Sequence, residues 1–148
     1  MSASSEGARR PPFLPETVRR FLRRGSTQLG GFIIVGIAVG LVLSMASYTP
    51  KDPSFNTANT AGVSNLLGYI GAYASDLFLQ SLGAASSVLV AILMAWAWAL
   101  ISYRRITLIW LRAAVGVLSI ILATVGFASI KPPLNWPVEA GFGGGLGT

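Results

Sequence analysis

The residues that could carry chemistry are few in this chain and far apart. It has five carboxylates and neither histidine nor cysteine, so the commonest general base, the commonest metal ligand and the thiol nucleophile are all missing. The carboxylates lie in separate segments: Glu6, Glu16, Asp52, Asp76 and Glu139. Acid–base catalysis needs titratable groups that converge on one substrate, and this spacing suggests no such pair. We therefore expect no catalytic residue, no bound cofactor and no metal ligand within this chain.

The glycine-rich C-terminal end has the composition of a phosphate-binding loop but not its pattern. Residues 141–148 read Gly-Phe-Gly-Gly-Gly-Leu-Gly-Thr. A Walker loop needs Lys followed by Ser or Thr after its last glycine, and no lysine follows Lys131. The dinucleotide pattern G-x-G-x-x-G is not met either. We interpret this segment as a flexible entry to another helix.

The composition indicates a membrane protein. Of the 148 residues, 53% are hydrophobic and 11% are charged, whereas soluble domains carry about 25% charged residues. A soluble fold of this length cannot hide so much apolar surface, so lipid must cover the remainder. The net charge of +6 is no nucleic-acid signal, because most of the basic residues gather in residues 9–24 and 104–112 instead of along one binding face.

Three uncharged windows are long enough to cross the bilayer as helices. A spanning helix needs about 20 apolar residues for about 30 Å of hydrocarbon. The windows cover residues 25–50, 77–103 and 113–130, and Ile106 to Trp110 can extend the third by a turn. The sequence therefore predicts an all-α, polytopic membrane protein with three transmembrane helices.

The charges outside these windows predict the orientation. The N-terminal tail and the turn after the second window carry almost all of the arginines, and basic residues favour the cytoplasmic side. We therefore expect a cytoplasmic N-terminus and an external C-terminal end. The arginines expected to set this topology or to contact lipid are Arg19, Arg20, Arg23, Arg24, Arg104 and Arg105. Arg112 is expected to extend its stem toward the headgroups, in preference to a functional charge inside the membrane.

Two alternatives concern the first segments. Val18, Phe21 and Leu22 have helical spacing among arginines, so a short basic amphipathic helix could lie on the inner leaflet; a pure topology role for the arginines is favoured over it. The small residues of Ser44-Met45-Ala46 would suit a signal peptidase. The apolar run before them, about 18 residues, exceeds that of usual signal peptides, so an uncleaved span is favoured.

In the segment between the first two windows, the sequence predicts the end of the first helix and then a second, short helix. Pro50 and Pro53 disfavour helix for the residues before them, so the first helix must end here. Ser64-Asn65 offers an N-cap for a helix over about residues 64–78.

Small residues on this short helix predict a packing face. Gly68, Ala72 and Ser75, with Gly71 beside them, form a stripe that would let another helix approach closely. A partly exposed helix that tolerates its glycines is an equal alternative. The GxxxG match at residues 36–40 is only weak evidence for a dimer face, because such matches are frequent in apolar segments.

Two motifs carry a family resemblance. Residues 47–55, Ser-Tyr-Thr-Pro-Lys-Asp-Pro-Ser-Phe, resemble the Ser-Tyr-x-Pro-x-Asp-Pro-Ser-aromatic segment just outside the first span of FtsK/SpoIIIE-type DNA translocases. Residues 65–77 are similar to the Asn-x-x-Gly-x-x-Gly-Ala-x-x-Ala/Ser-Asp stretch of that family, and the resemblance covers about residues 25–148. The residues singled out on these motifs, or for helix packing, are Asp52, Pro53, Asn65, Gly68, Gly71 and Asp76.

The resemblance implies a division protein of the bacterial inner membrane. The family's membrane domain anchors it at the septum and supports assembly of other division proteins, while a distant hexameric ATPase module pumps chromosomal DNA. The resemblance implies that ATP, Mg²⁺ and DNA bind only to that motor. For this chain it implies three kinds of partner: membrane lipids, other division proteins and further copies of the chain. The family domain has four spans, so we expect this chain to be a fragment cut at the entry to a fourth helix.

Two other functions stay open. An unrelated small membrane scaffold subunit fits the same composition, and a channel-forming oligomer is a weaker alternative because the middles of all three spans are uncharged. The expected segments are a cytoplasmic basic tail (1–28), transmembrane helices (29–48, 81–102 and 107–129), a periplasmic loop (49–80) with its short helix, a cytoplasmic turn (103–106) and a periplasmic glycine-rich tail (130–148).

Overall fold

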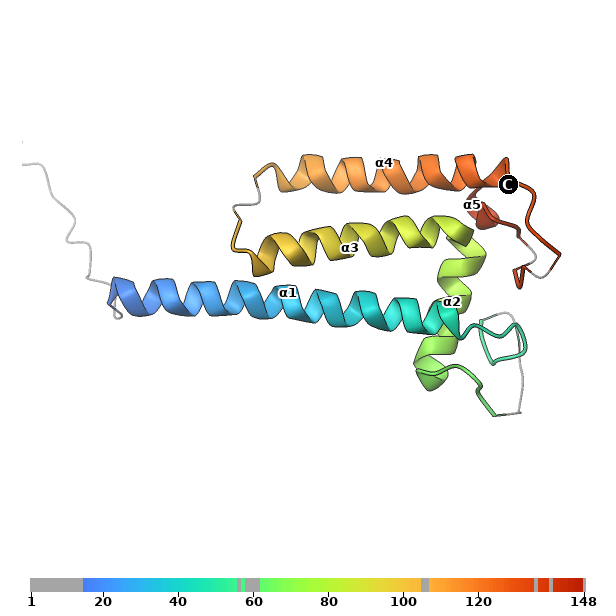
Figure 1. Cartoon of the computed structure of the whole chain (residues 1–148), viewed down its shortest axis with the longest axis horizontal. Coiled ribbons are helices and arrows are strands. Elements are labelled where there is room, and N and C mark those ends of the chain that lie inside the picture. Colours follow the sequence, from blue (N-terminus) through green and yellow to red (C-terminus); the bar gives the residue numbers. More distant parts are fainter. Residues whose placement is uncertain are drawn as a thin grey trace, which may run out of the picture.

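The computed structural model describes residues 15–55, 57, 62–104, 107–134, 136–138 and 140–147, and these form a helical bundle. Three long helices, α1 (Glu16–Ala46), α3 (Ser86–Ile101) and α4 (Ile109–Ala128), lie side by side and alternate in direction (Figure 1). Helix α2 (Gly68–Leu82) runs across one end of this bundle, and the 3-10 turn η1 (Gly83–Ala85) joins it to α3. The short helix α5 (Gly144–Gly147) lies at that same end.

The two ends of the bundle differ in chemistry. We call the end where α1 begins, α3 ends and α4 begins the basic end, because the described arginines Arg19, Arg20, Arg23, Arg24, Arg104 and Arg112 lie there. We call the opposite end, where α2 crosses α1, the polar end (Figure 1).

Helix α1 starts at Glu16, far before residue 29, the predicted start of the first transmembrane helix. No proline interrupts the chain between Pro15 and Pro50, and the exposed Glu16 carboxylate accepts a bond of 3.1 Å from the Arg20 guanidinium one turn later. At 1.5 Å per residue, its 31 residues span about 46 Å, more than the roughly 30 Å of hydrocarbon. The first turns of α1 therefore project beyond the other two long helices at the basic end (Figure 1).

Small residues bring α1 and α3 together. Ala38 and Ala97 are fully buried, and a Cβ on Gly31 would lie 3.0 Å from the Ala97 carbonyl oxygen. The glycines of the 36–40 GxxxG match do not make this contact: Gly36 has open space beside it. Close helix packing in the first span therefore depends on a different glycine from those that the pattern suggests.

A bend at Gly83 separates α2 from α3. Residues Gly68–Ile101 form one apolar helical stretch long enough to span a membrane, yet the chain turns sharply inside it (Figure 1). Gly83 has φ of +59°, which L side chains rarely adopt, and its Cα faces the backbone of Phe142 and Gly144. The Ala84 amide donates to the Phe142 carbonyl at 2.8 Å, so the C-terminal glycine segment closes over the bend.

The helix limits differ from the predicted ones, and the bend accounts for the C-terminal limit of α2. The short helix starts at Gly68 instead of about residue 64, and it continues to Leu82 instead of about residue 78. The contact of Gly83 and Ala84 with the C-terminal segment determines where α2 ends, and no local sequence pattern reveals this contact. The described glycine segment is thus packed against the bundle, with a side chain on Gly143 excluded by the Thr124 carbonyl at 2.8 Å.

Apolar side chains cover the outside of the long helices. Three helical stretches are long and apolar enough to cross a membrane: Glu16–Ala46, Gly68–Ile101 and Ile109–Ala128. On α4 even large side chains such as Val117 and Leu122 are exposed, which water would not favour but lipid does. The prediction of an all-α membrane protein with three spans and a further short helix is confirmed.

We predict that Gly83→Ala destabilises the bundle. The new methyl group would have to take a disfavoured backbone conformation and would overlap the backbone of the C-terminal segment, at a cost of about 2–4 kcal/mol. Thermal unfolding of the purified chain in detergent, followed by circular dichroism, measures the effect. Gly126→Ala on α4, where nothing lies within 4 Å, is the matched control and should leave the melting temperature unchanged or raise it. Equal melting temperatures for the two variants would contradict the role of the bend.

Candidate functional site

Most of the buried polar side chains gather at the polar end. Ser44 on α1, Asp52 and Asn65 in the connection, and Ser75 and Asp76 on α2 are each at most 5% exposed. We call these five residues the polar junction. Burial of polar groups is costly unless each one has a partner, so their hydrogen bonds decide what the junction does.

Asn65 lies at the centre of the polar junction. Its side-chain amide donates to the Ser44 carbonyl oxygen at 2.8 Å and approaches the Ser75 hydroxyl at 3.4 Å. Its side-chain oxygen accepts from the Leu67 amide at 3.1 Å, which fixes the turn just before α2. One side chain thus ties the end of α1 to the start of α2.

Asp52 holds Asn65 in place. Both carboxylate oxygens accept from backbone amides, one from Ser64 and one from Asn65, each at 2.9 Å. Hydrogen bonds to a carboxylate are stronger than those between neutral groups. These two bonds therefore hold Ser64 and Asn65 firmly against Asp52, although they lie 12 and 13 residues after it in the sequence. Pro53, the next residue of the motif, is also buried.

Gly71 leaves room for the connection that folds back against the start of α2. Its carbonyl oxygen accepts from two hydroxyls, that of Ser44 at 2.6 Å and that of Ser75 at 2.8 Å. A side chain on Gly71 would overlap the side-chain oxygen of Asn65 and lie 2.6 Å from the Cβ of Leu67. Gly68 differs, because nothing lies within 4 Å of it and only its φ of +62° favours glycine.

Asp76 joins the junction to the first residues after α1. Its Oδ1 accepts from the Tyr48 hydroxyl at 3.1 Å and from the Gln80 side-chain amide at 2.6 Å. Tyr48 follows directly on the last turn of α1, so this contact is a second link between α1 and α2. The described side chains contain no buried nitrogen or oxygen without a hydrogen-bond partner.

The structure brings together four of the residues singled out from the sequence, namely Asp52, Asn65, Gly71 and Asp76. Tyr48, which also belongs to the network, lies in the 47–55 motif but was not singled out, and Ser44 was given no packing or binding role from the sequence. A serine near the end of an apolar helix, followed by a polar connection, is the signal that could have pointed to Ser44. The hydrogen bonds of this arrangement fix α2 across α1.

The arginines lie apart from the polar junction, at the basic end. Arg19, Arg20, Arg23 and Arg24 are exposed on the first turns of α1. The Arg24 guanidinium carbon lies 5.9 Å from the centre of the Tyr103 ring. The exposed Arg104 follows α3, while Arg105 lies outside the described residues. Their roles in topology or lipid contact stay predictions.

We predict that Asn65→Asp weakens the junction. The carboxylate matches the amide in shape but cannot donate to the Ser44 carbonyl, so the cost is on the order of 2–4 kcal/mol. Denaturation in mixed micelles measures it, and hydrogen exchange should show faster exchange of the Leu67 amide. Ser87→Ala on α3, which removes one exposed hydrogen bond, should change stability by less than about 0.5 kcal/mol. Similar stabilities for the two variants would contradict the central place of Asn65.

Comparison with known proteins places this geometry in a family. The sequence pattern of the "4TM region of DNA translocase FtsK/SpoIIIE" matches residues 23–148. The chain is 32% identical over 127 residues to a protein named DNA translocase FtsK from Rhizobium meliloti, covering 86% of this chain and 14% of that relative. It is 29% identical over 155 residues to the Azospirillum brasilense protein of the same name, covering 99% and 25%.

A third relative extends the same similarity. DNA translocase FtsK of Caulobacter vibrioides is 35% identical over 128 residues, covering 78% of this chain and 14% of that protein. This chain therefore spans between about a seventh and a quarter of the length of these relatives. No solved structure matches it. Because the family pattern covers nearly the whole chain, including both motifs at the polar junction, the chain belongs to the FtsK/SpoIIIE family and corresponds to its N-terminal membrane region.

Proposed function

We propose that this chain anchors a septal DNA translocase in the bacterial cytoplasmic membrane and supports the assembly of other division proteins there. The observation that carries the proposal is the match of residues 23–148 to the 4TM region of that family. The three apolar spans provide an anchor, since a transmembrane helix is effectively irreversible in its insertion.

The motor is assigned to the remainder of the translocase. The relatives are named DNA translocases, and this chain covers only 14–25% of the three compared above. Hydrolysis of ATP with Mg²⁺ and contact with DNA belong in this proposal to a separate module. The described residues hold no group of three or more His, Cys, Asp or Glu that could bind a metal ion. A hexameric motor would bring six copies of this membrane region together.

The polar junction supports the assembly part of the proposal. It fixes α2 across the bundle, and the side of α2 away from the junction exposes Tyr69 at 62% and Ile70 at 83%. A surface on a rigid element is already ordered before a partner binds, and this lowers the entropic cost of association. We assign contacts with other copies or with division proteins to this side of α2.

The orientation in this proposal places the basic end in the cytoplasm. Among the described residues, six arginines lie at the basic end, and Lys51 and Lys131 lie toward the polar end. This distribution is the one that positive-inside insertion favours.

A septal localisation experiment tests the anchoring function. Residues 1–148 fused to a fluorescent protein should concentrate at division sites of a bacterium that carries the full translocase. Asn65→Asp in the fusion should keep membrane fluorescence but reduce the septal fraction, because α2 loses its fixed placement. Ser87→Ala is the control and should behave as the original fusion. Uniform membrane fluorescence of the original fusion would contradict septal targeting by this segment.

A charge-removal experiment tests the orientation. Replacement of Arg19, Arg20, Arg23 and Arg24 by Gln should give a mixed population of orientations, because the first span loses most of its flanking positive charge. Alkaline phosphatase and fluorescent reporters fused after residue 57 and after Arg104 report which side each segment occupies. Lys131→Gln is the control and should leave the orientation unchanged. Alkaline phosphatase activity after Arg104 in the original chain would overturn the assignment.

A further inference from the structure

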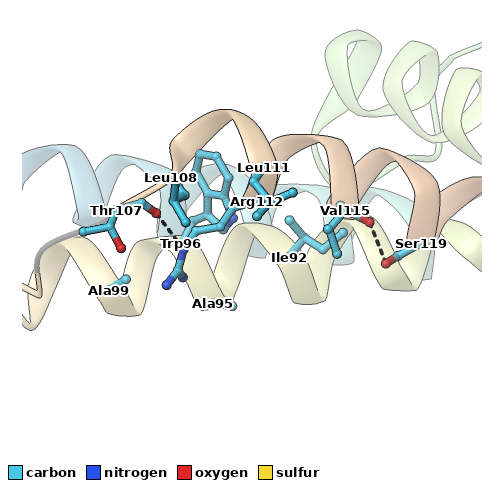
Figure 2. A pocket seen from close by; sticks show the side chains of 11 residues that line it. Ile92, Ala95, Trp96, Ala99, Thr107, Leu108, Leu111, Arg112, Val115 and Ser119 are labelled. Atoms are coloured by element: carbon cyan, nitrogen blue, oxygen red, sulfur yellow. Dashed lines mark hydrogen bonds between the residues drawn. The ribbon is translucent and has the colours of Figure 1, made fainter.

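A groove runs between α3 and α4 at the basic end of the bundle. It has a volume of about 520 Å³, and apolar side chains form most of its walls (Figure 2). Ile92, Trp96 and Ala99 line it from α3, Leu111 and Val115 line it from α4, and Leu108 lines it from the turn just before α4. These helices belong to two of the membrane-spanning stretches, so the groove opens toward lipid instead of water.

Arg112 is an exposed residue that lines this apolar groove. It belongs to the first turn of α4, and its Nε donates to the Thr107 carbonyl oxygen at 3.2 Å (Figure 2). Thr107 precedes the helix, so the side chain points back toward the basic end and away from the middle of the span. Leu108, in the left-handed conformation with φ of +54°, forms the turn between the two. The guanidinium is therefore held at the level where headgroups begin.

Two further arginines line a hollow next to the groove. This hollow of about 640 Å³ is lined by Arg23 and Arg104 together with Tyr103, and Thr107 lines both spaces. Within the described part of the chain, neither these two arginines nor Arg112 forms an ion pair. The apolar slot between α3 and α4 thus has Arg112 in its wall, and the adjoining hollow carries Arg23 from α1 and Arg104 from the residues after α3.

We propose that this slot binds one anionic phospholipid, with the headgroup phosphate on Arg112 and Arg104 and one acyl chain between α3 and α4. Guanidinium groups suit phosphate oxygens because they offer paired N–H donors, and basic pockets between transmembrane helices bind anionic headgroups in this way. A second copy of the chain fits the slot less well. It would bring its own arginines to the same end, and like charges facing each other oppose association.

Lipid retention by the purified chain tests the headgroup part. The whole chain in mild detergent is titrated with phosphatidylglycerol or with phosphatidylcholine of the same acyl chains, and native mass spectrometry counts bound lipid. Phosphatidylglycerol should bind with one preferred site and phosphatidylcholine should not. Arg112→Gln should lower phosphatidylglycerol affinity about fivefold, the effect of removing one basic contact, while Arg112→Lys should keep more of it. Lys131→Gln removes a charge at the far end of α4 and should match the original chain.

A second pair of variants tests the acyl-chain part without any change in charge. Ala99→Phe fills the slot and should lower phosphatidylglycerol binding at least as much as Arg112→Gln does. Ala114→Phe adds the same ring to the exposed face of α4 outside the slot and should leave binding unchanged. Melting temperatures measured in lipid-free detergent identify any variant that loses affinity only because it unfolds.

Three results would overturn the proposal. Equal retention of the two lipids would show unselective solvation, and phosphatidylglycerol binding that survives both Arg112→Gln and Ala99→Phe would place the lipid elsewhere. A lipid-independent dimer that Ala99→Phe dissociates would make the slot a contact between copies. None of these readouts depends on septal localisation, so failure here leaves the anchoring function to its own test.

Discussion

The last carbonyl groups of α1 need hydrogen-bond donors from outside the helix, and the side chain of Asn65 supplies one of them. The last four carbonyl groups of any helix have no partner inside it, and near a membrane such groups are costly to leave unpaired. Here the Ser47 amide bonds to the Leu43 carbonyl, the Tyr48 amide to that of Met45, and the Asn65 side chain to that of Ser44. The side chain that binds the Ser44 carbonyl belongs to Asn65, just before α2. The same hydrogen bond therefore caps the end of α1 and fixes the start of α2. The position of α2 therefore depends on the way the first span terminates.

Glycine makes the second half of this arrangement possible. At Gly71 the side chains of Asn65 and Leu67, in the connection just before α2, leave no room for a methyl group, and at Gly83 the chain turns so that α3 can run back beside α1. The C-terminal segment completes the turn, since Gly144 and Gly83 face each other backbone to backbone. A bundle whose outside is solvated by lipid gains little from burial of apolar side chains, so close backbone packing and interhelical hydrogen bonds carry much of its specificity.

The sequence predicted three apolar spans but not where the helices begin, bend and end, for a physical reason. The need for about 20 apolar residues acts along the chain, so uncharged windows reveal it without any knowledge of the fold. The bend at Gly83 and the start of α2 depend on Phe142 and Asn65, which contact them only after folding. Of the polar junction, Asp52, Asn65 and Asp76 were singled out from the family motifs and Ser75 from the stripe of small residues on the short helix, while Ser44 looked like any small residue in a span. Hydrogen-bond partners across 21 to 28 residues leave no periodic trace.

The charged side chains at the two ends of the bundle have different partners, and we assign different roles to the two ends for this reason. At the polar end the carboxylates of Asp52 and Asp76 are buried and accept hydrogen bonds from neighbours within the chain. At the basic end Arg23, Arg104 and Arg112 have no carboxylate partner among the described residues. An internally satisfied site is stiff and presents a fixed surface, which suits contact with proteins. Unpaired guanidinium groups at a membrane surface draw anions, and the nearest abundant anions are the phosphates of the lipids themselves.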